Sequence, residues 1–360
     1  MIRARDAAEW SRELGISREA VELYLDSDVI DLHLDTFIWQ RLFGYDPLVR
    51  HARPPLGGLF LGHADLPRVR EAGISGATWV VTTNPLRDPE DRLRALLDNL
   101  SRLSAVFAQM PEDFMLVRTL GEYRAARASG RHAAFIGIQG GNAIDATPDA
   151  IELLPPGLVL RVTLVHLSSS RIGSTSSPLR LGPDRGLGAF GHELIARMNA
   201  ARIFVDLAHI GKAAFWQAVE AHDPSLPLLV THTGVSGVHR HWRNLDDAQL
   251  RAVAASGGVV GIMFHSGYLG KSLLSGRSKE IVDHIAHVVR VVGDDYVALG
   301  SDFDGAIIPP RDLRSVLELP RLVEHMLERG FGPDRIQKIL GRNFLRALGE
   351  LRGTEPIQAS

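Results

Sequence analysis

The sequence alternates between short apolar runs rich in β-branched residues and longer amphipathic stretches. Eight apolar runs occur, at residues 29–35, 77–83, 133–139, 158–166, 203–209, 226–233, 257–264 and 296–302. Helically spaced apolar residues lie between them, most clearly at 92–109, 191–201, 245–255, 279–292 and 314–329. Strands that alternate with helices form βαβ units and a parallel sheet. Eight such units predict an α/β fold, a closed (β/α)8 TIM barrel.

The competing architecture is an open, doubly wound sheet. That fold usually carries a Gly-rich phosphate-binding turn after its first strand, and none follows residues 29–35. The 360 residues are 45% hydrophobic, and α/β barrels often reach this length as one domain. We therefore expect a single barrel over 1–360, with an N-terminal helical extension at about 1–28 and a loose tail at about 352–360. Segment 168–191, rich in Ser, Gly and Pro, should form an irregular loop over the strand ends.

Composition excludes several classes of function. The formal net charge is -2, so the basic excess that favours a nucleic-acid partner is missing. The sequence has no cysteine, which excludes disulfides, thiolate metal sites and a cysteine nucleophile. The charged N-terminal stretch lacks the apolar core of a signal peptide, and no apolar run approaches the roughly 20 residues that span a bilayer. We expect a cytoplasmic protein without a membrane partner.

Polar residues stand at the carboxyl ends of the predicted strands. They are His33, Asp35, Gln139, His166, His209, His232 and Asp302. In a parallel barrel these ends converge on one mouth, where active sites are built. His33 and Asp35 are two residues apart, so both point to the same face of a strand. One such histidine alone is more often a hydrogen-bonded core residue, but a shared metal ion would satisfy several of these groups together. The set predicts a metal site at the mouth.

The remaining histidines are expected to have structural or solvated roles. Those expected to be solvated on helices or turns are His132, His192, His222, His284 and His287. His63 and His239 are expected in loops, whereas His265 follows the seventh strand and is a candidate for the mouth. Asp206 lies inside the fifth strand and should be a buried supporting carboxylate, and Asp304 should cap a turn.

Seven stretches of the chain follow the order of a known family. They are IDLHLDTF (30–37), ADLPRVREAGISGATW (64–79), IGIQGGNAID (136–145), VTLVHLS (162–168), GLGAFGHELIARMNAARIFVDLAHI (186–210), LLVTHTGVSGVHRHWRN (228–244) and LGSDFDG (299–305). Through them the chain resembles the membrane (renal) dipeptidase family, zinc-dependent hydrolases of the amidohydrolase type. The resemblance runs over nearly the whole sequence. It implies a barrel enzyme that acts on a small peptide-like substrate, and a homodimer.

The resemblance also implies a centre with two Zn²⁺ ions. His33 and Asp35 would bind one ion, and His209 and His232 the other. Where the family has a glutamate that bridges the two metals, this chain has Gln139. An amide is neutral and offers one good oxygen, whereas a carboxylate offers an anionic oxygen to each cation. Gln139 would thus be a weaker metal ligand, and a site with one zinc is an alternative.

The substrate-binding and catalytic roles follow from the same resemblance. His166 would contact the substrate near its scissile carbonyl and stabilise the oxyanion. Asp302 would face the attacking water, take its proton and pass it to the leaving amine. Arg243 would hold the substrate carboxylate, and His265 is a further candidate for substrate binding. Three functions stay open: a two-zinc dipeptidase, a one-zinc hydrolase of another small amide or lactam, and a catalytically impaired dipeptidase-like binding protein.

Overall fold

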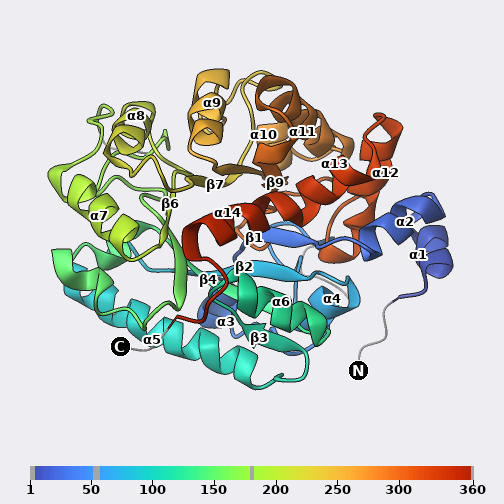
Figure 1. Ribbon diagram of the computed structural model, residues 1–360, viewed down its shortest axis with the longest axis horizontal. Coiled ribbons are helices and arrows are strands. Elements are labelled where there is room, and N and C mark those ends of the chain that lie inside the picture. The colour runs from blue at the N-terminus through green and yellow to red at the C-terminus, as the bar shows by residue number, and fades with distance from the viewer. Residues whose placement is uncertain (1–4, 52–56, 179–181, 358–360) are drawn as a thin grey trace.

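A closed barrel of eight parallel strands forms the centre of the molecule, in a computed structural model that describes residues 5–51, 57–178 and 182–357 (Figure 1). The barrel strands are β1 (Ile30–Leu34), β2 (Gly76–Thr82), β4 (His132–Gln139), β5 (Val159–Thr163), β6 (Phe204–Asp206), β7 (Leu229–Thr233), β8 (Val259–Ile262) and β9 (Val297–Leu299). Pairing of β9 with β1 and of β2 with β4 closes the ring. The predicted TIM barrel is confirmed, with one barrel strand in each predicted run.

One further strand was not predicted. The strand β3 (Phe114–Leu116) pairs with the first residues of β4, on the edge where β5 pairs with the later ones. It therefore lies outside the ring. Three residues are too few to display a period-two pattern, so the sequence carries no signal for it.

Helices surround the strands, and Figure 1 shows them as an outer layer. They are α1 (Ala7–Leu14), α2 (Arg18–Leu25), α3 (Thr36–Phe43), α4 (Leu66–Glu71), α5 (Pro89–Ala108), α6 (Leu120–Ala128), α7 (Ala189–Ala200), α8 (Lys212–Ala221), α9 (Asp247–Ala255), α10 (Ser266–Leu269), α11 (Lys279–Val292), α12 (Pro320–Glu328), α13 (Pro333–Gln337) and α14 (Asn343–Arg352). The predicted helix 314–329 is divided into a short 3-10 turn (Val316–Glu318) and α12, because Pro320 suits only the first turn of a helix.

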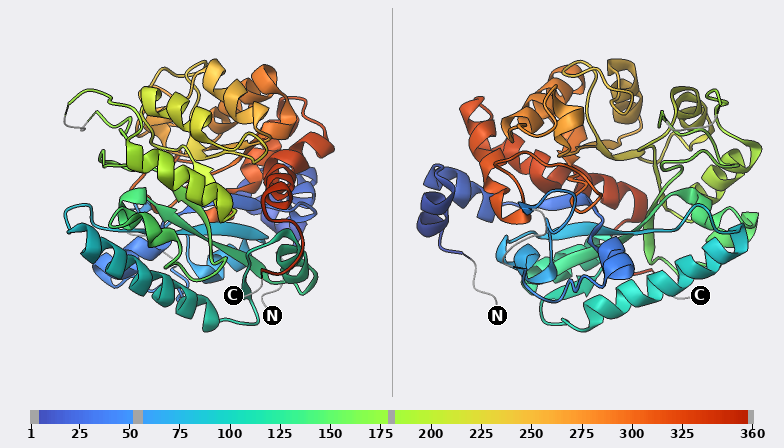
Figure 2. Two further views of the ribbon diagram at one scale, coloured as in Figure 1. Left: turned by 60° about the vertical axis from the view of Figure 1, so that its left-hand side comes forward. Right: turned by 180° about the vertical axis from the view of Figure 1, so that it is seen from behind.

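The two chain ends lie against the outer layer. Helices α1 and α2 stand outside the ring, where α2 packs on α12 (Figures 1 and 2). Trp10 and Tyr24 hold this pair together, with buried rings edge-to-face at 5.7 Å. At the other end, the Gly353 carbonyl accepts a hydrogen bond from Leu120 N at 3.1 Å. The expected loose tail is described as far as residue 357 and has no helix or strand after α14 up to that point.

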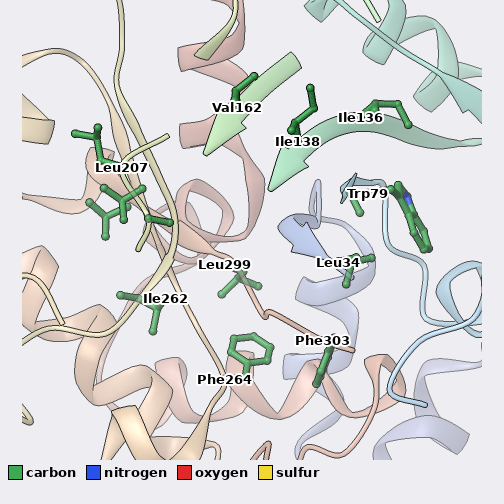
Figure 3. Close-up of a cluster of buried hydrophobic side chains, with 14 of the residues drawn as sticks. Leu34, Trp79, Ile136, Ile138, Val162, Leu207, Ile262, Phe264, Leu299 and Phe303 are labelled. Atoms are coloured by element: carbon green, nitrogen blue, oxygen red, sulfur yellow. The ribbon is translucent and has the colours of Figure 1, made fainter. Parts of the chain in front are cut away.

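Apolar side chains pack on both sides of the barrel wall. Figure 3 shows the outer cluster, where Leu34, Ile138 and Leu299 come from different strands and pack toward the helices. The inner cluster fills the amino-terminal half of the barrel and joins it to α14; it includes Ile30, Leu32, Phe135, Leu160, Phe204, Leu229, Phe344 and Leu348. The buried polar side chains of the mouth lie at the opposite, carboxyl-terminal end of the strands.

The segment 168–191 forms the expected irregular loop, since its described residues contain no helix or strand before α7. Thr175 ties it to the barrel, because its hydroxyl lies within hydrogen-bond distance of the backbone carbonyls of His166 and His209 and can donate to either. Those residues follow β5 and β6, so the loop lies over the carboxyl ends of these strands. Within the described residues, no helix combines the length and the apolarity that crossing a bilayer requires.

Candidate functional site

The predicted strand-end residues come together at one mouth of the barrel. His33 Nε2 lies 3.2 Å from Asp35 Oδ2 and 3.6 Å from Asp302 Oδ1. His209 Nε2 and His232 Nε2 are 2.8 Å apart, and the rings of His33 and His232 are 3.9 Å apart. All five of these side chains are buried. Residues from β1, β6, β7 and β9 or just after these strands therefore form one compact cluster.

Gln139 and His166 complete this cluster. Gln139 ends β4, and His166 follows β5 by three residues. With the amide oriented so that both of its ends meet complementary groups, Gln139 Oε1 accepts from His166 Nε2 at 3.2 Å. The amide nitrogen then donates to both carboxylate oxygens of Asp35 at 3.0 Å.

A cavity of about 340 Å³ opens onto the cluster. Six of its lining residues are Asp35, Gln139, His166, His209, His265 and Asp302. His265 thus reaches the mouth, where its ring lies 4.4 Å from that of Tyr268. Another cavity, of about 380 Å³, lies near the C-terminal segment, and its lining contains no histidine or aspartate. Of these two cavities, the smaller combines a small-molecule volume with chemically active groups.

Arg243 lies behind the cavity and is not part of its lining. The guanidinium is buried, and its Nη2 donates to the backbone carbonyl of His232 at 2.7 Å. Its Nε has no hydrogen-bond partner among the described residues. The predicted contact of Arg243 with a substrate carboxylate stays a prediction.

Backbone strain is concentrated at the mouth. His209 and Asp302 adopt φ values of 64° and 61°, in the left-handed region that non-glycine residues rarely adopt. Next to Asp302, Gly305 is required by space, since a Cβ there would lie 2.2 Å from Asp302 Oδ1. Asp304, at φ 68°, accepts from Thr36 Oγ1 at 2.5 Å and from His63 N at 2.8 Å. It therefore fixes the turn after β9, as expected for a structural carboxylate.

Asp206 anchors a buried network beneath the mouth. Its carboxylate accepts from Arg161 Nη1 at 3.1 Å and from the hydroxyls of Thr163 and Thr231, both at 2.7 Å. Burial alone would raise the pKa of Asp206, but Arg161 and these donors outweigh it and hold the pKa below its usual range. Asp206 is thus the supporting carboxylate that the sequence predicts, whereas Arg161 was missed.

Four histidines expected to be solvated are buried instead, namely His132, His222, His284 and His287. His192 is exposed, as expected. The physical reason is that a neutral imidazole has one donor and one acceptor, so two neighbours can satisfy it away from water. In His284, for example, Nδ1 accepts from Val235 N at 2.8 Å and Nε2 donates to Leu269 O at 3.0 Å.

The electrostatics of the mouth favour neutral imidazoles. Burial lowers the pKa of His166 to about 4 and, together with nearby Arg243, holds the pKa of His209 well below its usual value. Burial, reinforced by the carboxylate of Asp35, raises the pKa of Asp302 well above its usual range. Neutral imidazole is the form that binds metals, and a carboxyl with a raised pKa can exchange protons near neutral pH.

The donor set fits a divalent cation. Ligand atoms of His33, His232 and Asp302 lie within 4.8 Å of one another. The Nε2 atoms of His209 and His232 converge at 2.8 Å, and His209 Nδ1 is a buried nitrogen without a partner among the described residues. Imidazole and carboxylate groups around an open cavity are typical ligands of catalytic zinc.

Fold and mouth together define the class of protein: a (β/α)8 barrel of the metal-dependent hydrolase type. Residues 17–358 match the membrane dipeptidase family, peptidase family M19, and the chain belongs to this family. The resemblance to this family seen in the sequence is therefore confirmed.

Three solved structures are similar to the chain over most of its length. The dipeptidase AC, a metallopeptidase of family M19, is 25% identical, with a TM-score of 0.81 over 91% of this chain and 99% of the other. A metallopeptidase from Rhodobacter sphaeroides, liganded with a phosphinate mimic of the dipeptide L-Ala-D-Ala, is 25% identical, with a TM-score of 0.80 over 91% and 100%. The probable dipeptidase PvdM from Pseudomonas aeruginosa, 18% identical with a TM-score of 0.82 over 96% and 100%, shows the shared fold.

Proposed function

We propose that this protein is a zinc-dependent hydrolase that cleaves the amide bond of dipeptides or similar small substrates. The observation that carries the proposal is the convergence of His209, His232 and Asp302 at one mouth of the barrel, where His209 and Asp302 line a small cavity. The dipeptide mimic bound to the Rhodobacter sphaeroides metallopeptidase supports a substrate of this size. Membership of the membrane dipeptidase family supports the reaction.

His209 and His232 would hold the metal, which supplies Lewis-acid activation of water and of the scissile carbonyl. Asp302 borders the cavity, and its raised pKa suits it to take a proton from water and return it to the leaving amine. His166 directs Nε2 to the same region, where an N–H can stabilise a developing oxyanion. Arg243 and His265 would position the substrate, Arg243 through the attraction of its charge for a carboxylate.

Gln139 favours a second candidate, a hydrolase of another small amide or lactam. Its amide occupies the oxygens of Asp35 and brings no negative charge to the centre. A panel of L,L- and L,D-dipeptides, N-acyl amino acids and lactams, assayed with added Zn²⁺, separates the two candidates. Hydrolysis of dipeptides supports the first, and hydrolysis confined to the other amides supports the second. No hydrolysis of any amide by zinc-loaded, folded protein would contradict both and leave a binding protein.

The residue assignments are tested by Asp302→Asn and His166→Ala. Each should lower kcat at least about 100-fold, because proton transfer and oxyanion stabilisation each contribute on this scale. The thermal unfolding midpoint should change little in both variants, and the zinc content should change little in His166→Ala. The exposed His192→Asn is the matched control and should keep full activity. Wild-type rates in both variants would contradict the mechanism.

Two further proposals come from the sequence. The first is a cytoplasmic location, and the second is a homodimer in solution. Light scattering after size-exclusion chromatography measures the second directly, and a molar mass near the 39.4 kDa of one chain would contradict it.

A further inference from the structure

The buried arginine of β5 lies directly behind the mouth. Arg161 is fully buried, and its Nη2 donates to His33 Nδ1 at 2.7 Å. Its Nη1 donates to Asp206 Oδ2 at 3.1 Å and to Thr163 Oγ1 at 2.5 Å. A guanidinium this deep in a barrel is held in place by paired hydrogen bonds, since an unpaired buried charge is very costly.

The barrel wall is shaped to admit this side chain. The pairing of β5 with β4 shifts between Val159 and Arg161, which face the consecutive residues Ile136 and Gly137. This irregularity turns Arg161 into the interior, as bulges next to active sites often do. Gly137 provides the room, since a Cβ there would lie 2.7 Å from Arg161 Nε.

Arg161 fixes the tautomer of His33. Guanidinium nitrogens carry only hydrogens, so His33 Nδ1 must be the acceptor of their bond. The neutral ring then carries its proton on Nε2, the nitrogen that faces Asp35 at 3.2 Å and Asp302 at 3.6 Å. A protonated nitrogen has no lone pair for a metal, so His33 acts as a hydrogen-bond donor at the mouth, although one of its ring nitrogens lies within 4.8 Å of ligand atoms of His232 and Asp302.

His232 has the opposite tautomer. The single hydroxyl hydrogen of Thr231 goes to Asp206 Oδ2 at 2.7 Å, because a carboxylate can only accept. Thr231 Oγ1 therefore accepts from His232 Nδ1 at 3.0 Å. The proton of His232 is thus on Nδ1, and its Nε2 presents a free lone pair beside His209. Asp206 and Arg161 together define one imidazole as a ligand and the other as a donor.

Asp35 is already saturated by donors. Its carboxylate faces the Nε2–H of His33, and the amide nitrogen of Gln139 lies 3.0 Å from both of its oxygens. The same amide nitrogen lies 3.3 Å from His33 Nε2, but that ring nitrogen carries a hydrogen and cannot accept from it, so Asp35 is the acceptor. The charges agree with this arrangement. The carboxylates of Asp31, Asp35, Asp206 and Asp302 stand against the guanidiniums of Arg161 and Arg243, a balance of at most two negative charges. One divalent cation can neutralise this balance, whereas two would leave at least two positive charges.

We infer that Arg161, through the tautomer it imposes on His33, excludes one of the two metal ions, and that the centre holds a single divalent cation on the side of His209 and His232. The inference rests on the proposed metal-dependent function and deepens it. The residues His33 and Asp35, predicted from the resemblance to bind one zinc, then serve as a hydrogen-bonded pair that borders the cavity.

The first experiment counts metal ions. Wild type, Arg161→Met, Gln139→Glu and the double variant are stripped with chelator, dialysed against excess Zn²⁺ and analysed by elemental analysis, with exposed Arg251→Met as the matched control. We expect one equivalent in wild type, in both single variants and in the control, and two in the double variant. Two equivalents in wild type, or one in a folded double variant, would overturn the inference.

The second experiment is made on wild-type protein, so that it remains informative if Arg161→Met does not fold. Long-range ¹H–¹⁵N NMR spectra of histidine-labelled wild type report the tautomer of each ring, with His33→Asn and His232→Asn used only for assignment. We expect a proton on Nε2 of His33 with and without Zn²⁺, and a proton on Nδ1 of His232 whose Nε2 signal moves on zinc binding. A His33 ring that carries its proton on Nδ1 and responds to zinc would refute the inference.

Peptide hydrolysis, measured on the same samples, keeps the two proposals apart. One equivalent of zinc without hydrolysis of any amide contradicts the proposed function and leaves the role of Arg161 intact. Two equivalents of zinc in an active wild-type enzyme support the proposed function and contradict the role of Arg161.

Discussion

Acid is expected to destabilise this protein through His132, the first residue of β4. The ring is fully buried, and Trp79 Nε1 donates to its Nε2 at 3.2 Å. Its Nδ1 donates to the carbonyl of Ile74 at 2.8 Å. Since an indole N–H can only donate, Nε2 has no room for a second proton. Burial accordingly lowers the pKa of His132 from 6.5 to about 3.

The size of the effect follows from these two pKa values. The unfolded chain binds a proton at His132 near pH 6.5, and the folded protein does so only near pH 3. Stability from the neutral ring is therefore complete above pH 6.5 and is lost as the pH falls toward 3. At pH 5 the protonation of the unfolded chain alone should lower the free energy of unfolding by about 2 kcal/mol.

The assay compares wild type with His132→Asn in urea denaturation at pH 7.5, 6 and 5, in chelator so that metal binding does not contribute. Asparagine keeps a donor toward Ile74 but does not titrate. It leaves Trp79 Nε1 without its acceptor, which costs about 1–3 kcal/mol at every pH and cancels in the comparison. Between pH 7.5 and 5, wild type should lose about 2 kcal/mol more than the variant. Parallel curves for the two proteins, with exposed His192→Asn behaving like wild type, would refute the reasoning.

Three other perturbations have definite expected results. Gly300→Ala should lower the free energy of unfolding by at least about 3 kcal/mol, because its Cβ would lie 1.7 Å from Thr231 O. The control Gly332→Ala places its Cβ in open space and should change the free energy of unfolding by less than about 1 kcal/mol. Arg243→Met should raise KM for dipeptides about tenfold or more with a smaller effect on kcat, and an unchanged KM would exclude a role in binding the substrate carboxylate. Dipicolinate should abolish hydrolysis and leave the far-ultraviolet circular dichroism unchanged, with activity restored by Zn²⁺; activity that survives removal of the metal would exclude a metal-dependent reaction.

Much of the fold and of the mouth was predictable, because both depend on local patterns. Apolar runs of strand length reveal the barrel, and a polar residue at the end of such a run must emerge at the mouth, as His209 and Asp302 do. The buried histidines were not predictable from such patterns. His132 is satisfied by Ile74 and Trp79, 58 and 53 residues earlier, and only the folded chain brings them together.

Arg161 marks the boundary of what the sequence can predict about the site. It stands two residues before Thr163 in an apolar run, so period-two geometry already suggests that both face the same side of β5. A charge in such a run also requires a buried partner. What the run cannot reveal is that the guanidinium meets His33, 128 residues earlier, or that Asp206 acts on His232 through Thr231. Position at a strand end therefore predicts that an imidazole lies at the mouth, but the group bonded to its other nitrogen decides whether it can bind a metal ion.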